Sequence, residues 1–344
     1  DNRKDLVTPY LVDVVARDPD LDLALLRVKN APPNLRPIEV GDSEEVDIGE
    51  PVAAIGHPGG GGLWTLTTGT VSSKRKDQSR DIFQTDTAIN PGNSGGALVD
   101  MAGRLLGLNT SILTRSGGSN GIGFAIPSNL VRAYVDRAGE GALPWPWAGI
   151  TGQSIDGELA QALGLDRPQG VLLSEVHPAS AFAAAGLTPG DVVLEIDSLP
   201  VATPGELEYR IQTRPLGETA QIAYMRDGSR DEAAINVSAA PEDPPRDPLR
   251  LDGTGNLFSD MLAETVNPAV IAEMDLPLNA SGVVVREPGQ AGRILGLRAG
   301  DVIEQVNGRQ IETTADLEAV VRTLDRGVDL RLSRDGRRHA LRFR

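Results

Sequence analysis

The sequence predicts a mainly β protein built from three consecutive globular blocks. Short apolar runs between Gly, Pro, Asn and Asp turns fill the first part of the chain, which is typical of a β-barrel or sandwich. Two proline-rich seams, at residues 141–146 and 241–248, separate this part from two later segments that resemble each other. A chain of 344 residues also has room for two or three domains of ordinary size.

The first block, residues 1–140, is expected to end in a helix. Ser128 is a candidate N-cap, and Gly139 follows the last apolar position, where a glycine commonly ends a helix. The apolar stripe between them consists of Leu130, Val131, Tyr134 and Val135. The strands before this helix are predicted to form the main body of the block.

Residues 145–240 and 253–344 are predicted to be two copies of one α+β domain. The segment 185–193 (Ala-Gly-Leu-Thr-Pro-Gly-Asp-Val-Val) returns at 295–303 as Leu-Gly-Leu-Arg-Ala-Gly-Asp-Val-Ile. The offset between Gly186 and Gly296 is 110 residues (296 − 186). Two copies are too few for a solenoid, so each is expected to fold as a domain.

Two shorter features complete this organisation. Arg226-Asp227-Gly228 in the first copy returns as Arg334-Asp335-Gly336 in the second, and each triplet predicts a hairpin turn between two late strands. The proline-rich run 241–248 is predicted to be a linker that does not pack against a domain.

The run Asn90–Leu98 carries the strongest chemical signal. It places Ser94 among glycines, after a turn and before an apolar strand. Glycine allows a backbone turn tight enough for the N–H groups of Gly92 and Ser94 to point at one spot, where a tetrahedral oxyanion would sit. The loop therefore predicts a nucleophilic serine that shares its loop with the oxyanion donors.

A nucleophilic serine needs a general base, and the three histidines of the chain supply none in a recognisable setting. Asp22 opens an apolar strand and is expected to be partly buried at a barrel entry, where a carboxylate must be paired. The order Asp22, His57, Ser94 mimics that of subtilisins, but subtilisin-like surroundings are missing. His57 lies in a turn, and His177 and His339 lie in the later copies. None of them shows metal-ligand spacing.

The first block resembles the HtrA/Do (DegP/DegQ-like) family of chymotrypsin-like serine proteases. The resemblance rests on Asp-Leu-Ala-Leu-Leu at 22–26, Gly-Asn-Ser-Gly-Gly at 92–96, and the segments 84–89 and 103–111. It implies a chymotrypsin-like double β-barrel whose first barrel is incomplete in this chain. It also implies that Ser94 is the nucleophile, that Asp22 orients a catalytic histidine expected upstream of Asp1, and that Gly92 and Ser94 form the oxyanion hole.

The same resemblance implies a set of substrate-binding residues. Residues shortly before the nucleophile line the primary specificity pocket in this family, and a strand after it pairs with the substrate backbone. The residues at these positions, with one from the nucleophile loop, are Ala88, Ile89, Asn93, Asn109, Thr110 and Ser111. Small or aliphatic residues at 88 and 89 predict cleavage after residues such as valine or alanine.

The two repeated copies resemble PDZ domains, through the Gly-Leu-x-x-Gly-Asp-Val-hydrophobic turn and the strand after it. In PDZ domains a peptide adds as a strand to a sheet edge, and backbone N–H groups capture its terminal carboxylate. In the first copy the carboxylate loop is matched by Trp147, Ala148, Gly149 and Ile150, and the helix near Glu206 would form the other groove wall. Residues 257–261 show no such loop, so the second copy is expected to serve packing or assembly at least as readily as peptide binding.

Composition excludes several classes of partner. A net charge of −15 and a pI near 4.7 argue against nucleic acid as a partner. Without cysteine the chain has no thiolate ligand or disulfide, and no metal or cofactor is predicted. No apolar run approaches the roughly 20 residues that a membrane-spanning helix requires.

The resemblance to the HtrA/Do family implies an ATP-independent serine endopeptidase that degrades unfolded or misfolded proteins in the bacterial periplasm or cell envelope. The resemblance implies unfolded proteins and C-terminal peptides as partners and a homo-oligomer, a trimer or multiples of it. A signal peptide is expected upstream of the given chain. The alternatives are a protease-inactive chaperone that binds peptides through PDZ domains, if the histidine is truly absent, and a PDZ-based interaction protein with a β scaffold.

Overall fold

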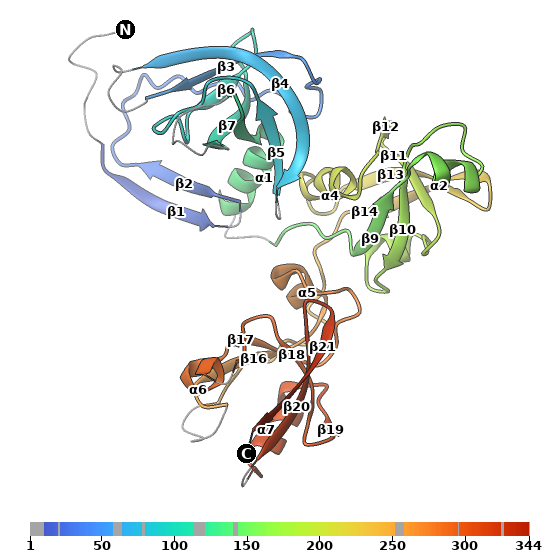
Figure 1. Cartoon of the computed structure of the whole chain (residues 1–344). Coiled ribbons are helices and arrows are strands. Elements are labelled where there is room, and N and C mark those ends of the chain that lie inside the picture. Colours follow the sequence, from blue (N-terminus) through green and yellow to red (C-terminus); the bar gives the residue numbers. More distant parts are fainter. Residues whose placement is uncertain are drawn as a thin grey trace. The chain divides into compact units, whose positions relative to one another are not determined.

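The structure is a computed structural model that describes residues 10–19, 21–57, 64–77, 80–112, 121–139, 144–251, 258–294, 296–324 and 327–343. It confirms a mainly β chain, shown in Figure 1. Contacts divide it into two compact units, residues 1–145 with 205–215, and residues 146–204 with 216–344.

A six-stranded closed barrel forms the body of the first unit, with strand order β3-β4-β5-β8-β7-β6. The long strand β4 curves along this barrel in Figure 1. Apolar side chains such as Val52, Phe83 and Leu98 fill its interior. The strands are β3 (Pro51–Gly56), β4 (Thr65–Asp77), β5 (Arg80–Thr85), β6 (Ala97–Val99), β7 (Leu105–Ile112) and β8 (Gly123–Pro127).

A second, smaller sheet represents the predicted incomplete barrel. The antiparallel strands β1 (Val12–Asp18) and β2 (Leu23–Val28) pair only with each other among the described residues. Helix α1 (Ser128–Gly139) contacts both strands, and Leu23 is buried in one cluster with Leu130 of this helix. The expected two-barrel plan is therefore present as one closed barrel and a ribbon packed on α1.

The helix α1 has the predicted extent, but Ser128 does not act as the expected cap. Its hydroxyl donates to the carbonyl of Gly41 at 2.9 Å, and the hydroxyl of Ser43 accepts from the amide of Asn129 at 3.0 Å. A serine from a distant segment therefore satisfies a donor at the start of the helix, which local sequence could not reveal.

The first repeated copy contains a sheet of order β14-β13-β11-β10-β9, with β12 paired to β11. Strand β9 is the last strand on its side of this sheet, which leaves an edge. The elements are β9 (Ile150–Ser154), α2 (Gly157–Ala162), β10 (Val171–Val176), α3 (Ala181–Ala184), β11 (Val192–Ile196), β12 (Leu199–Pro200), α4 (Pro204–Gln212), β13 (Thr219–Arg226) and β14 (Ser229–Asn236).

The second copy repeats this plan with one additional strand. Its sheet has the order β15-β16-β17-β18-β20-β21, with β19 paired to β18. The elements are β15 (Leu249–Leu251), β16 (Met261–Thr265), α5 (Pro268–Met274), β17 (Val283–Glu287), α6 (Gly289–Ile294), β18 (Val302–Val306), β19 (Arg309–Gln310), α7 (Thr314–Val321), β20 (Val328–Arg334) and β21 (Arg337–Phe343).

The prediction that residues 241–248 form an unpacked linker is wrong. The carbonyl of Pro241 accepts from the amide of Ala269 at 3.2 Å, and the carbonyl of Arg246 accepts from the amide of Thr265 at 2.7 Å. Proline removes a backbone donor but keeps its carbonyl acceptor, so a proline-rich segment can still be held along a domain.

Candidate active site

The loop that carries Ser94 is held by backbone hydrogen bonds at both ends. Gly92 (φ 101°) and Gly95 (φ 79°) adopt left-handed conformations that favour glycine. The amide of Asn93 donates to the carbonyl of Asn90 at 2.9 Å, which closes the turn before the serine. The amide of Gly95 donates to the carbonyl of Asn109 at 2.8 Å, so strand β7 fixes the loop from the other side.

Ser94 and Asp22 converge on Thr110, which lies in strand β7. The Ser94 hydroxyl donates to the Thr110 carbonyl at 2.7 Å, and the Thr110 hydroxyl donates to Asp22 Oδ2 at 2.5 Å. The structure thus brings together the two predicted catalytic residues. Ser94 is exposed and accessible to a substrate. Asp22 is also exposed, so the prediction that it is partly buried is wrong. Its backbone adopts φ 58° in the turn before β2.

The assignment of the Gly92 and Ser94 amides as oxyanion donors stays a prediction. Among the described residues, none accepts a hydrogen bond from the amide of Gly92 or Ser94. The carbonyl of Gly92 instead accepts from the amide of His57 at 3.2 Å, which fixes the peptide plane that follows Gly92. The ring of His57 lies edge-on to Trp64, with the ring centroids 6.3 Å apart. Backbone amides aimed at a developing oxyanion are a main source of rate enhancement in acyl transfer.

Several predicted substrate-binding residues have buried side chains. Ile89 is 1% exposed and packs in the barrel core, so it offers almost no surface to a substrate in this conformation. Asn93 is 2% exposed and lies against Gly56. The side chain of Asn109 donates to the carbonyls of Ile55 and Ala97, both at 3.2 Å, and so bridges strands β3 and β6.

The remaining predicted residues lie near the same loop. Ala88 is half-buried, and its carbonyl accepts from the Thr67 hydroxyl at 2.9 Å. Ser111 belongs to β7 beside Thr110, but its side chain lies outside the described part of the structure. The role of these residues in substrate binding stays a prediction. The contact between Thr110 and Asp22 was missed because it joins side chains far apart in the sequence.

The first copy has a preformed loop ahead of its edge strand β9. Gly149 adopts φ 62°, and its carbonyl accepts from the amide of His177 at 2.8 Å. The rings of Trp147 and His177 lie edge-on, with their centroids 5.1 Å apart. Burial lowers the pKa of His177, which favours its neutral form beside this loop. An edge strand next to such a loop can accept an additional strand.

The second copy has a corresponding loop that the sequence analysis missed. Phe258, Ser259, Asp260 and Met261 precede and open β16 as residues 147–150 precede and open β9. Asp260 adopts φ 61°, close to the φ 62° of Gly149. Aspartate is among the residues that tolerate the left-handed conformation, so it can replace the glycine whose absence hid this loop.

The described part of the chain has neither a candidate metal site nor a membrane-spanning helix. Among the described residues, no group of three or more His, Cys, Asp or Glu side chains is placed to hold a metal ion. In the same part of the chain, no helix is long and apolar enough to cross a membrane.

The fold and the site define a trypsin-like serine protease followed by two PDZ domains. Residues 3–108 match the family described as "Trypsin-like peptidase domain", and residues 149–237 and 282–334 each match a PDZ domain family. These ranges fall inside the three predicted blocks, whose bounds of 1–140, 145–240 and 253–344 stay predictions.

The chain belongs to the HtrA/DegP-type family of periplasmic serine endoproteases. It is 35% identical over 340 residues to a "Probable periplasmic serine endoprotease DegP-like" of Pseudomonas putida (strain GB-1), covering 96% of this chain and 70% of the relative. It is 34% identical over 316 residues to "Periplasmic serine endoprotease DegP" of Escherichia coli (strain K12), covering 90% of this chain and 63% of that protein. The solved structure "HtrA-type protease AlgW with tripeptide" is 37% identical, with a TM-score of 0.50, and the match covers 68% of this chain and 78% of that one.

Proposed function

We propose that this protein is an ATP-independent endopeptidase of periplasmic quality control that cuts unfolded or misfolded proteins. The observation that carries the proposal is the convergence of Ser94 and Asp22 on Thr110, beside a loop that presents two backbone amides. Ser94 would attack the scissile carbonyl, and the amides of Gly92 and Ser94 would stabilise the oxyanion.

The general base in this proposal is a histidine from a segment that precedes Asp1. Asp22 would accept a hydrogen bond from this histidine and hold it in the tautomer that can take the proton of Ser94. The P. putida relative has room for such a segment, because the alignment covers 70% of its length. We further propose a homo-oligomer, a trimer or multiples of it.

The test compares the chain of residues 1–344 with the same chain extended at its N-terminus by the residues that its gene encodes upstream of Asp1. In the extended chain a labelled fluorophosphonate is expected to modify Ser94, and an unfolded protein such as reduced α-lactalbumin is expected to be digested. The Ser94→Ala variant of the extended chain should do neither. If the extended chain carries no histidine ahead of Asp22 and its serine stays unreactive, the endopeptidase proposal fails and a chaperone that holds unfolded chains becomes the better account.

Thr110→Val examines the geometry of the site without removing a predicted catalytic residue. The substitution removes a hydrogen bond to a carboxylate, and a hydrogen bond to a charged group is worth about 1.5–3 kcal/mol. We expect the kcat of the extended chain to fall by roughly 10- to 150-fold with KM little changed, because the loss concerns orientation. An unchanged kcat would contradict the role of Thr110 in holding Asp22.

We also propose that the first PDZ domain grips substrates by adding their C-terminal segment to β9. Gly149→Ala tests this role, because a Cβ there would lie 2.6 Å from the Ser180 Cβ and 2.9 Å from the Trp147 ring. Binding of a labelled peptide with a free C-terminus should weaken at least about tenfold. Gly186→Ala is the matched control, since Gly186 has φ +84° but open space around it. Equal peptide affinity in both variants would count against the proposal.

A further inference from the structure

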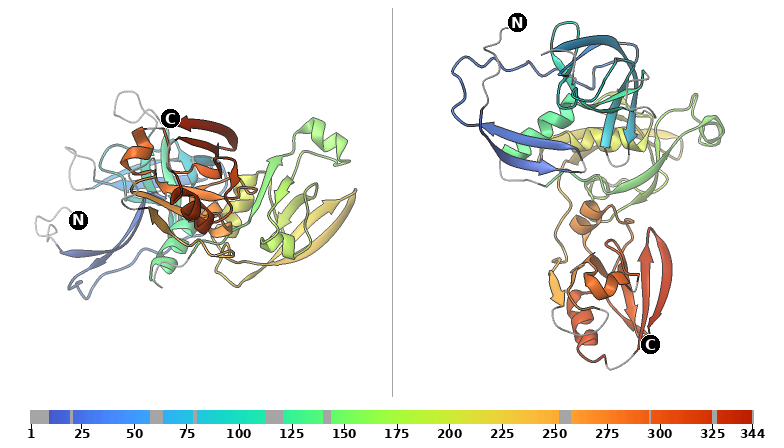
Figure 2. Two further views of the ribbon diagram at one scale, coloured as in Figure 1. Left: turned by 90° about the horizontal axis from the view of Figure 1, so that it is seen from below. Right: turned by 60° about the vertical axis from the view of Figure 1, so that its left-hand side comes forward.

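The two PDZ domains differ at the sheet edge that takes a peptide. In the first domain β9 ends the sheet, whereas in the second domain the equivalent strand β16 has β15 on its outer side. The short strand β15 is visible in the right-hand view of Figure 2. It comes from residues 249–251, immediately after the proline-rich segment, and not from the repeated part of the domain.

Strand β15 runs in the direction that a peptide ligand would take. It pairs with β16 antiparallel, with Leu249 opposite Ala263 and Leu251 opposite Met261. The end of β15 therefore lies beside the start of β16, where the carboxylate loop is found in the first domain. The carbonyl of Leu251 accepts from the amide of Asp260 at 2.9 Å, and Asp260 holds the left-handed position equivalent to Gly149.

The side chains of β15 fill an apolar site between strand and helix. Leu251 is 5% exposed and belongs to the same buried cluster as Phe258 and Leu317, and Leu249 packs against this cluster. Helix α7 contacts both β15 and β16. Alternate residues of an added strand point to one face, so Leu249 and Leu251 occupy the places of two alternate ligand side chains.

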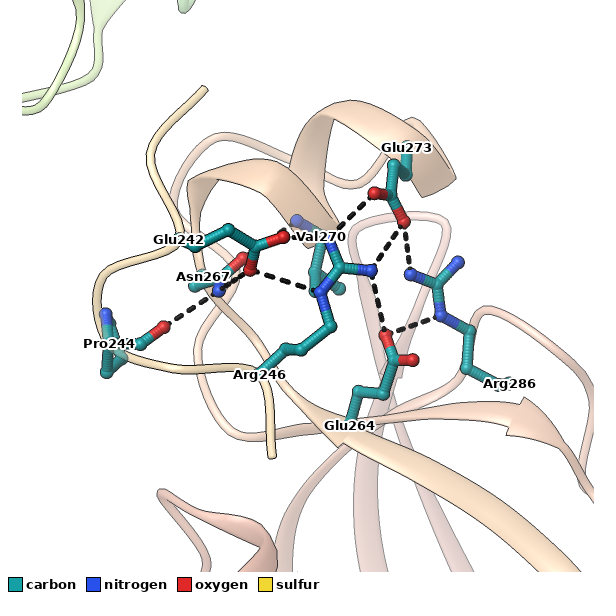
Figure 3. Close-up of polar contacts among 8 residues, drawn as sticks. All are labelled: Glu242, Pro244, Arg246, Glu264, Asn267, Val270, Glu273 and Arg286. Atoms are coloured by element: carbon teal, nitrogen blue, oxygen red, sulfur yellow. Dashed lines mark hydrogen bonds and ion pairs between the residues drawn. The ribbon is translucent and has the colours of Figure 1, made fainter. Parts of the chain in front are cut away.

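A cluster of charged side chains anchors the chain just before β15 (Figure 3). Arg246 donates to Glu242 and, at 2.9 and 2.7 Å, to Glu273, and it lies 3.7 Å from Glu264. Arg286 donates to Glu264 at 2.7 Å and to Glu273 at 2.5 Å. The side chain of Arg246 is 24% exposed, whereas its hydrogen-bond partners Glu242 and Glu273 are 53% and 47% exposed, so the anchor depends on several charges that act together in one network.

The same segment is held by its backbone. The Arg246 carbonyl accepts from the amide of Thr265, the last residue of β16, at 2.7 Å. Asn267 also donates to the carbonyl of Pro244 at 2.7 Å (Figure 3). Residues 246–251 therefore follow β16 along its length, with β15 as the end of the held segment.

We propose that Leu249–Leu251 is an internal ligand of the second PDZ domain, which Arg246 holds in the peptide groove. The groove is closed to protein C-termini while this segment is bound. When the segment leaves, the groove takes an extended C-terminus with leucine at its last and third-last positions. A ligand on the same chain acts at a millimolar effective concentration, so an external peptide at micromolar concentration does not displace it.

Hydrogen–deuterium exchange on the full chain tests this proposal, because it reports each domain separately. The probe is a peptide ending in Pro-Leu-Arg-Leu with a free carboxylate, the sequence of residues 248–251. In the wild-type chain we expect residues 260–265 to be protected already and to gain no protection from the peptide. In Arg246→Gln these amides should exchange about tenfold faster, and the peptide should restore their protection.

Two further variants make the result decisive. Arg342→Gln is the matched control, because Arg342 makes an exposed pair with Asp329 at 3.0 Å on strands β21 and β20, at the opposite end of the sheet from β15, and it should behave as wild type. Leu251→Ser removes an apolar side chain of the internal ligand and leaves Arg246 and its charged partners unchanged. The Leu251→Ser chain should bind the peptide at β16, while the rest of the second PDZ domain keeps its exchange protection.

Protection of wild-type β16 by the peptide would overturn the proposal. Failure of Leu251→Ser to take the peptide at β16 would also overturn it, and unchanged exchange in Arg246→Gln would refute the anchoring role of Arg246. Protection of β9 is read from the same data. If the peptide leaves β9 unprotected, the gripping role of the first domain fails, whatever happens at β16.

Discussion

Arg334→Gln should destabilise the second PDZ domain more than any change to a surface charge. Arg334 donates to Asp301 at 2.6 and 2.7 Å and to the carbonyl of Gly296 at 2.8 Å. The side chain of Asp301 is 0% exposed and that of Arg334 is 18% exposed. The substitution leaves a buried carboxylate that keeps the hydrogen bond from the amide of Arg298, at 2.8 Å.

The expected magnitude follows from this burial. Removing one partner of a buried ion pair costs about 3–5 kcal/mol, because the other charge stays desolvated. A domain of this size loses about 4–8 °C in melting temperature for each kcal/mol, so the transition of this domain should fall by at least about 12 °C. Arg226→Gln in the first domain should cost somewhat less, since the side chain of Arg226 is 41% exposed, although that of Asp191 is only 2% exposed.

Differential scanning calorimetry of the full chain measures the effect, with the second domain's transition assigned by exchange protection. Arg338→Gln is the control, because Arg338 is 87% exposed and 3.5 Å from Glu304, and such a pair is worth about 0–1 kcal/mol. The double variant Asp301→Asn with Arg334→Gln should recover part of the loss by removing the buried charge. If Arg334→Gln shifts the transition no more than Arg338→Gln, this reasoning is refuted.

Two further predictions concern the nucleophile loop and the charged cluster. Gly56→Ala would place a Cβ 2.7 Å from the Asn93 Cα, so we expect at least a tenfold loss of peptidase activity in the extended chain. The control Gly157→Ala, which has open space around its Cβ, should keep full activity. Equal activities of the two variants would contradict this account. Hydrogen bonds from Arg246 lower the pKa of Glu273, so its stabilising contribution is complete above the ordinary value of 4.5 and is lost as the pH falls through the lowered value. Melting of the second domain between pH 7 and pH 3 should therefore show a steeper acid loss in wild type than in Arg246→Gln, and parallel curves would exclude the linkage.

Features that depend on local backbone geometry were predicted from the sequence. The glycines around Ser94 indicated a tight loop, since a left-handed residue is costly for most side chains, and the structure has such residues at Gly92 and Gly95. The repeat of segment 185–193 likewise predicted two domains of one fold, and family matches confirm two PDZ domains. The missed loop at Asp260 shows the limit of this reasoning, because a left-handed position does not require glycine.

Contacts between distant residues were decided by the tertiary structure. The sequence showed a repeated Gly-Asp motif and a repeated Arg-Asp-Gly turn, but only the sheet brings Arg334 to Asp301, and only the barrel brings Thr110 to Asp22. The proline-rich segment was predicted wrongly for the same reason, since groups that hold it lie in β16 and α5. The class of fold and the chemistry of the nucleophile loop could be read from the sequence, because these follow from local backbone preferences and residue order. The partner of each carboxylate and the occupant of the second PDZ groove depend on which distant surfaces meet when the chain folds.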